Sequence, residues 1–398
     1  MTRTSIHEYA AAQRDRYARS PRKEKGRILD EVVAVTGYHR KAAIRLLHRP
    51  PCGRPMRRRS GRPRVYGPTE AAAVQVVWDA AGEIGATRLH PFVPELLDRL
   101  AASGELVLVP ETAGAVRRAS AATLKRLLAP ARRSRPPRGR GVTRAGTWLK
   151  RQIPIRTFAD WAEAQPGFLE GDLVAHCGNS TEGFYLCTLC AVDIITSWIE
   201  LERVWGKGQQ RVGGAIDHIR GRLPMPLLGW DCDTGSEFIN ATLWEYCQRH
   251  QITFTRGRAY KKNDSAHVEQ KNGAVVRRWI GYDRYATRVA YAALGEVHRL
   301  LRLHVNFFQP VQKLIDKVRV GTRVGTRVRR VYDQAQTPYH RLCASGVLKP
   351  EQREALDTLY RSLKPLELRH QLDAALDRLW NLATPTPRRG AVVEEKYL

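Results

Sequence analysis

The chain has 398 residues, and its 67 lysines and arginines against 39 aspartates and glutamates give a net charge of +28. An excess of this size indicates a polyanionic partner such as a nucleic acid. No apolar run approaches the roughly 20 residues of a membrane span, and the start of the chain lacks the apolar core of a secretory signal. We therefore expect a protein of the cell interior without a membrane partner.

Residues 1–52 predict a helical DNA-binding domain. Two short segments with apolar periodicity are separated by Gly37, which is the pattern of a helix-turn-helix. Arg40, Lys41 and Arg45 would then be available to a DNA groove. The alternative is a plain helical hairpin, because helix pairs joined at a glycine are common.

Residues 53–68 predict an extended basic arm, since the stretch contains two Gly-Arg-Pro sequences and no acidic residue. Arg54, Arg62 and Arg64 suit the narrow minor groove of DNA, which attracts arginine side chains. A basic linker that contacts only phosphates is an equal alternative. Either interpretation has the arm bind DNA.

Residues 69–130 predict a second helical domain. Ser120 is a suitable N-cap for its last helix, which carries Lys125 and Arg126 as further DNA contacts. The basic stretch that follows is rich in proline and glycine, so residues 131–164 are expected to be a linker.

Residues 165–310 predict an α/β domain with a mixed five-stranded sheet. Three apolar runs at short spacing, FLEGDLVAHC, GFYLCTLCAVDI and SWIELERVW, indicate a three-stranded meander. Helices and two more short strands alternate after them, so helices should cover the sheet. Cys187 and Cys190 form a C-x-x-C, but without a second Cys or His pair at zinc spacing we expect core cysteines rather than a metal or redox site.

Residues 311–398 predict a small basic region of strands and helices. The sequence RVGT occurs twice in succession, and the alternation of valine with arginine predicts a strand with one buried and one basic face. Residues 350–382 indicate a helical hairpin.

Three acidic residues occur in settings that suit phosphodiester chemistry. Asp172 is in the predicted strand FLEGDLVAH, Asp233 ends a strand in GWDCDTGSEF, and Glu269 lies in the helix that contains AHVEQKN. Two divalent cations about 4 Å apart can activate an oxygen nucleophile and stabilise a departing 3′ oxygen. Hard cations such as Mg²⁺ take oxygen ligands, which carboxylates provide.

The spacing of these acids is D-x60-D-x35-E. With DTGSEF and KKNDSAHVEQKN, it resembles the catalytic core of the DDE integrases and insertion-sequence transposases over residues 165–310. The resemblance implies an RNase H-like fold, with the first Asp on the first strand, the second after the fourth strand, and the Glu on a helix across the site. It also implies that Asp172, Asp233 and Glu269 are catalytic residues that bind two Mg²⁺ ions, with Mn²⁺ as a substitute.

Two features depart from that family. Members often carry Asp-Asn-Gly where this chain has Asp233-Thr234-Gly235, which changes a supporting residue and keeps the carboxylate. The zinc-binding N-terminal domain of retroviral integrases is missing, because Cys52 is the only cysteine before Cys177.

Other acids compete for the same roles, namely Glu170, Asp193, Asp231, Glu237 and Asp264. Asp231 is the strongest rival of Asp233, since alternation along a strand turns both to one face. We prefer Asp233 because it is nearer the strand end and fits the Asp-x-Gly-x-Glu-Phe resemblance. Asp193 is expected to hold a turn between two strands.

Basic residues around Glu269 are candidate phosphate contacts. Lys261, Lys262 and Lys271 surround it in sequence, although solvated lysines are an equal alternative. Arg277 would share the Glu269 face at 100° per residue and could hold a DNA phosphate. A buried stripe is expected on the same helix, formed by Val268, Val275, Val276 and Trp279.

The resemblance implies a bacterial, cytoplasmic and nucleoid-associated transposase that nicks the ends of a mobile element and joins them to target DNA as a homo-oligomer. Two rivals stay open: a nuclease of the same fold that cuts without joining, and a non-catalytic DNA-binding regulator derived from a transposase. The sequence leaves open the element-end sequence, the target preference, the number of subunits and any need for an accessory ATPase.

Overall fold

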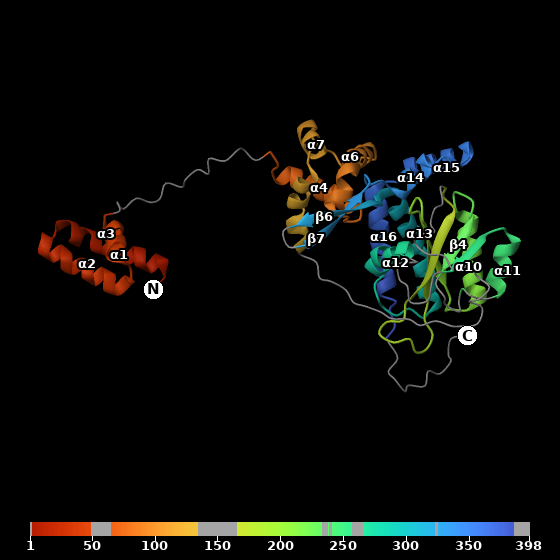
Figure 1. Cartoon of the computed structure of the whole chain (residues 1–398), viewed down its shortest axis with the longest axis horizontal. Helices are drawn as coiled ribbons and strands as arrows, with labels where there is room; N and C mark the ends of the chain where they lie inside the picture. The colour runs from red at the N-terminus through yellow and green to blue at the C-terminus, as the bar shows by residue number, and fades with distance from the viewer. Residues whose placement is uncertain are drawn as a thin grey trace. The chain divides into compact units, whose positions relative to one another are not determined.

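The structure is a computed structural model that describes residues 2–48, 65–133, 165–232, 238, 241–256, 266–322 and 325–385 (Figure 1). The chain divides into two compact units, residues 1–64 and 65–398. Residues 69–130, predicted as a domain of their own, belong to the same unit as the sheet. In the described part of the chain, no helix is both long enough and apolar enough to cross a membrane.

The first unit, where the structure describes it (residues 2–48), contains three helices: α1 (Arg3–Arg19), α2 (Arg22–Thr36) and α3 (Arg40–Leu47). Gly37 ends α2 in the left-handed conformation (φ +67°), and its N–H donates to the carbonyl oxygen of Val33. Glycine reaches this conformation without steric cost, which explains the turn at this position. The core of the unit is apolar, and its larger cluster contains Tyr17, Ile28, Leu29, Val32, Ala43 and Leu47.

Helices from both ends of the second unit pack against each other. The N-terminal set is α4 (Pro68–Ala80), α5 (Ala86–Leu89), η1 (His90–Phe92), α6 (Val93–Ala102), α7 (Pro110–Arg117), α8 (Ala121–Leu127) and α9 (Ala129–Arg133). The C-terminal set is α14 (Pro338–Ala344), α15 (Pro350–Ser362) and α16 (Pro365–Trp380). Helices α4 and α6 contact α16, and the Arg99 guanidinium stacks on the Tyr360 ring at 4.4 Å.

The second unit contains a five-stranded sheet in the order β3-β2-β1-β4-β5. Its strands are β1 (Phe168–Ala175), β2 (Cys187–Asp193), β3 (Ile199–Val204), β4 (Gly229–Cys232) and β5 (Thr253–Arg256). Strand β2 is antiparallel to β1 and β3, whereas β4 is parallel to β1 and β5. This mixed topology confirms the predicted RNase H-like fold.

Helices cover both faces of the sheet. They are α10 (Gln209–Arg222), α11 (Ala241–Arg249), α12 (Ala266–Lys271), the π-helix η5 (Asn272–Arg277) and α13 (Arg288–Phe308). Figure 1 shows α10 and α11 on one side of β4 and α12, α13 and α16 on the other. Every residue of β2 is buried, including Cys187 and Cys190, as a strand covered on both faces requires. Burial raises the pKa of the Cys247 thiol in α11 to about 12.

A two-stranded ribbon, β6 (Leu314–Thr322) and β7 (Gly325–Tyr332), carries the Val/Arg repeats. The predicted division into a buried valine face and a basic face is wrong. Val318 pairs with Arg329 and Arg319 with Val328, so cross-strand pairs mix the two residue types, and Val318 and Val328 are 41% and 51% exposed. Side chains opposite each other in a ladder share a face, which therefore mixes valine with arginine.

Gly171 allows β1 and β4 to approach closely. A Cβ at this position would lie 2.1 Å from an atom of the buried Trp230 ring. Gly171→Ala is expected to lower the free energy of unfolding by about 3 kcal/mol, because a rigid ring must move in a packed core. Urea unfolding checks this result against Gly214→Ala, a matched change in α10 with no atom near the new methyl group. The control should gain about 0.5–1 kcal/mol of helix propensity; equal effects of both changes would contradict the explanation.

Candidate active site

Strand β1 presents Glu170 and Asp172 on one face, because side chains two residues apart in a strand point the same way. Asp172 lies in the strand, as predicted. Its Oδ2 accepts a hydrogen bond from Asn272 Nδ2 at 2.6 Å, and its Oδ1 accepts one from the Leu173 N–H at 2.7 Å. Asp172 is thereby tied to the start of the π-helix η5.

Glu269 lies in α12, three residues before Asn272, and its side chain is exposed. Residues three apart on a helix are neighbours on its surface, so Glu269 and Asn272 lie on adjoining turns of one face. The charge of Glu269 also contributes to the raised pKa of Glu170 on β1. The structure therefore brings Glu269 and Asp172 to the same region of the sheet.

Asp233 lies outside the described residues. Strand β4 ends at Cys232, which is paired with Gly171, the residue immediately before Asp172. Among the residues that the structure describes, no group of three His, Cys, Asp or Glu side chains could hold a metal ion. The role of Asp233 as a third ligand stays a prediction.

Two further acids near Asp172, Glu170 and Asp231, are buried in the sheet. Glu170 is completely buried, and its Cα partner in β4 is Asp231, which is 1% exposed and accepts a 2.6 Å hydrogen bond from Thr255 Oγ1. Burial raises the pKa of Glu170 to about 8, and the charges of Asp231 and Glu269 act in the same direction. The hydrogen bond from the Val268 N–H lowers it in part. Burial therefore favours the protonated form of Glu170.

The donor atoms around Asp172 suit a hard cation. The Asp172 and Glu269 carboxylates supply oxygen atoms, and Asn272 Oδ1 is buried without a hydrogen-bond partner. Oxygen atoms of this kind are the ligands that Mg²⁺ prefers.

Lys271 of α12 was predicted to be either a phosphate contact or a solvated lysine. It is only 7% exposed, so it is not a solvated lysine, and burial lowers its pKa to about 8.

Arg277 is held by the protein framework. Its Nη2 donates to the carbonyl oxygen of Ala175 at 2.9 Å and its Nη1 to that of Gly281 at 3.4 Å, and the guanidinium lies 4.8 Å from the centre of the Tyr282 ring. These contacts give Arg277 a structural role at the end of β1. Its contact with a DNA phosphate stays a prediction.

Of the ten other predicted DNA contacts, five are described by the structure and five are not. Arg40, Lys41 and Arg45 are exposed on α3, and Arg40 forms an ion pair with Asp30. On α8, Lys125 and Arg126 are exposed, and Ser120 caps this helix as predicted by accepting the Thr123 N–H at 3.2 Å. The remaining five lie outside the described residues: Arg54, Arg62, Arg64, Lys261 and Lys262.

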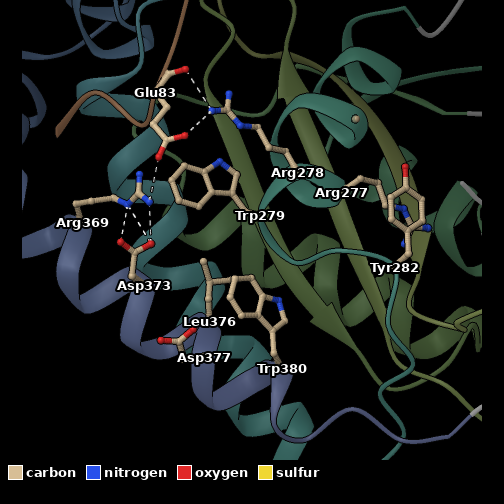
Figure 2. Close-up of a pocket in the computed structure, with 11 residues that line it drawn as sticks. Glu83, Arg277, Arg278, Trp279, Tyr282, Arg369, Asp373, Leu376, Asp377 and Trp380 are labelled. Carbon is tan, nitrogen blue, oxygen red and sulfur yellow. Dashed lines mark hydrogen bonds and ion pairs between the residues drawn. The ribbon is translucent and has the colours of Figure 1, made fainter. Parts of the chain in front are cut away.

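A pocket of about 630 Å³ opens beside the π-helix, with Gly273 in its wall (Figure 2). Arg278 bonds to the carbonyl oxygen of Gly82 at 3.0 Å and lies 3.9 Å from the Glu83 carboxylate. Arg369 of α16 pairs with Asp373 at 2.9 Å and reaches Glu83 at 4.0 Å. The pocket wall thus joins the helix of Glu269, the loop after α4 and the C-terminal helix α16.

One curated protein is similar over most of its length. It is the uncharacterized protein y4rM of Sinorhizobium fredii, which is 42% identical over 333 residues that cover 82% of this chain and 92% of y4rM. No family model matches the chain.

Solved structures with similarity to the chain include retroviral integrases. The magnesium-bound catalytic core of HTLV-2 integrase is 14% identical and covers 37% of this chain and 91% of its own, with a TM-score of 0.28. The simian T-cell lymphotropic virus intasome is 14% identical and covers 54% of this chain and 69% of its own, with a TM-score of 0.31. The catalytic core of BIV integrase is 16% identical and covers 49% of this chain and 98% of its own, with a TM-score of 0.30. Because TM-scores this low do not establish a fold, the RNase H-like fold is assigned from the strand order β3-β2-β1-β4-β5.

Proposed function

We propose, on the premise that the chain belongs to the same family as the Sinorhizobium fredii protein y4rM, that it is a DDE-type transposase or integrase. It would cleave DNA at the 3′ ends of a mobile element and transfer these ends to target DNA. The observation that carries the proposal is the hydrogen bond between Asn272 and Asp172, which joins the helix of Glu269 to the first strand of an RNase H-like sheet.

The residues of the proposed site have two different roles, metal binding and orientation of a metal ligand. Asp172 and Glu269, with Asp233, would hold Mg²⁺, and Asn272 orients the Asp172 carboxylate through its amide. Bound Mg²⁺ would supply the positive charge that favours an oxygen nucleophile and a departing 3′ oxygen. No covalent bond between protein and DNA is required.

DNA binding is proposed for the first unit and for the ribbon β6–β7. The described part of α3 exposes Arg40, Lys41 and Arg45, and the ribbon exposes Arg319, Arg329 and Arg330. A helix or a two-stranded ribbon fits the major groove of DNA. Joining two element ends in one event would also require more than one copy of the chain.

The double change Lys41→Ala and Arg45→Ala is expected to weaken DNA binding about tenfold and to reduce the dependence of the affinity on salt by about two ions, because each lost phosphate contact retains one counterion. Fluorescence anisotropy with a labelled duplex at several salt concentrations measures both quantities. Lys23→Ala with Arg19→Ala, an equal loss of charge on α2 and α1, is the control. Equal losses in the two double variants would show that net charge alone matters.

The strand-transfer assay separates this proposal from its rivals. Full-length protein is incubated with Mg²⁺ or Mn²⁺, a target plasmid and oligonucleotides copied from the DNA that flanks its own gene. Covalently joined product supports a transposase or integrase. Cleavage without joining supports an RNase H-like nuclease, and DNA binding without either reaction supports a regulator.

A further inference from the structure

Glu170 is hydrogen-bonded to the helix of Glu269. Its carboxyl is completely buried on β1, two residues before Asp172, and its Oε2 accepts the backbone N–H of Val268 at 2.9 Å. Val268 immediately precedes Glu269 in α12. Any movement of this backbone relative to β1 would move the Glu269 side chain by a similar distance.

The Glu269 segment is fastened to β1 on both sides. The Glu170 bond fixes the residue before Glu269, and the bond from Asn272 to Asp172 fixes the residue three positions after it. Both bonds end on the same strand, on side chains that point to the same face. The separation between the Asp172 and Glu269 carboxylates is therefore set by two short connections.

The chemistry of Glu170 argues against a role in core filling. A carboxyl group without an ionic partner costs free energy when buried, and an apolar side chain would fill the same space at lower cost. The hydrogen bond that its Oε2 accepts comes from the backbone of α12, at Val268. The first N–H groups of a helix lack partners within it, so an acceptor from the strand satisfies one of them.

We infer that Glu170 is a positioning residue that holds Glu269 at the distance from Asp172 required for binding a divalent cation. This inference rests on the proposed function and concerns the geometry of the same site. It predicts that the hydrogen-bond acceptor of Glu170, rather than its charge, sets the affinity for the cation. Loss of residues that support metal ligands commonly costs about 10–100-fold in affinity.

The test measures Mn²⁺ binding by electron paramagnetic resonance on the full chain. Glu170→Leu puts an apolar side chain of similar size in place of the carboxyl and removes the acceptor, and it is expected to weaken Mn²⁺ binding at least about tenfold. Glu170→Gln keeps an acceptor oxygen and should stay within about threefold of wild type. The matched control is Asp193→Asn, which changes a buried acid of the same sheet that accepts the Gly167 N–H at 2.8 Å and holds the turn at Thr196. This control is expected to lower thermal stability without changing Mn²⁺ affinity.

The outcomes distinguish the inference from the proposed function. If Asp172→Asn and Glu269→Gln abolish Mn²⁺ binding while Glu170→Leu leaves it unchanged, the inference is wrong and the metal site stands. A tenfold loss in Glu170→Gln also overturns the inference, and this variant decides the question alone if Glu170→Leu does not fold. If neither Asp172→Asn nor Glu269→Gln affects Mn²⁺ binding, the proposed site itself is wrong and the inference fails with it.

Discussion

Asp172→Asn and Glu269→Gln are each expected to lower the rate of strand transfer about 10³-fold. A bound cation contributes several kcal/mol to stabilising the charge of a phosphoryl transition state, and each 1.36 kcal/mol corresponds to a factor of ten in rate. Both substitutions keep the size of the side chain and remove one anionic oxygen. The measurement is the initial rate of joined product with excess Mg²⁺.

The matched control for these substitutions is Glu245→Gln, which changes an exposed acid on α11 in the same unit. Its rate should stay within about twofold of wild type, and the DNA affinity of all three variants should be unchanged, since none of the residues is a predicted DNA contact. A Glu269→Gln variant that transfers strands at the wild-type rate would exclude Glu269 as a ligand. Loss of DNA binding in that variant would instead indicate damage to the fold.

Acid is expected to unfold the second unit at about pH 4, because three histidines are buried in a neutral form. Burial lowers the pKa of His176 and of His304 to about 3, with nearby arginines acting in the same direction, and it lowers the pKa of His298 well below its usual value. A lowered pKa contributes stability that is present above about pH 6.5 and is lost as the pH falls towards the folded-state value. At pH 4, His176 and His304 together remove about 7 kcal/mol.

Glu170 opposes this loss. Its pKa is raised to about 8, so its contribution to stability is full below about pH 4.5 and is lost as the pH rises through 8. Between pH 7 and pH 4 it restores about 3 kcal/mol, which leaves the histidines dominant. The net loss is a large part of the roughly 5–15 kcal/mol that stabilises a typical domain.

Tryptophan fluorescence and circular dichroism during an acid titration measure this unfolding. His304→Phe removes one titrating group from a site packed against Trp279 and Phe308, and it should shift the midpoint to lower pH. His218→Gln, at an exposed position on α10, should leave the midpoint unchanged. Equal midpoints in wild type and His304→Phe would show that burial of this histidine does not control acid stability.

The sequence predicted the parts of the site that depend on local pattern. Alternation of apolar residues placed Asp172 on a strand, and the valines of the Glu269 helix, Val268, Val275 and Val276, are buried as expected. The turn role of Asp193 is also confirmed, since its Oδ1 accepts the Thr196 N–H at 2.6 Å. Each of these features is set by residues close together in the chain.

Features that depend on distant contacts could not be predicted. Glu170 was only one of several competing acids, because nothing in its neighbourhood indicates a partner in α12. Lys271 stands in a polar stretch that suggests exposure, yet the sheet buries it. Arg277 was placed by a rotation of 100° per residue, which does not hold across the π-helix η5. The Val/Arg alternation of β6 and β7 likewise could not show whether another element covers the ribbon.

The two connections that fasten α12 to β1 have a consequence for the order of folding. They join residues that are 98 and 100 positions apart, and Arg99 bonds to the carbonyl oxygen of Leu363 at 2.6 Å across 264 positions. Contacts of such long range slow folding, because a long loop must close before they contribute. During synthesis the three described helices of the first unit can form from residues 2–48 alone, whereas the connections around Asp172 can form only after Val268 and Asn272, about 100 residues further along the chain, have been made.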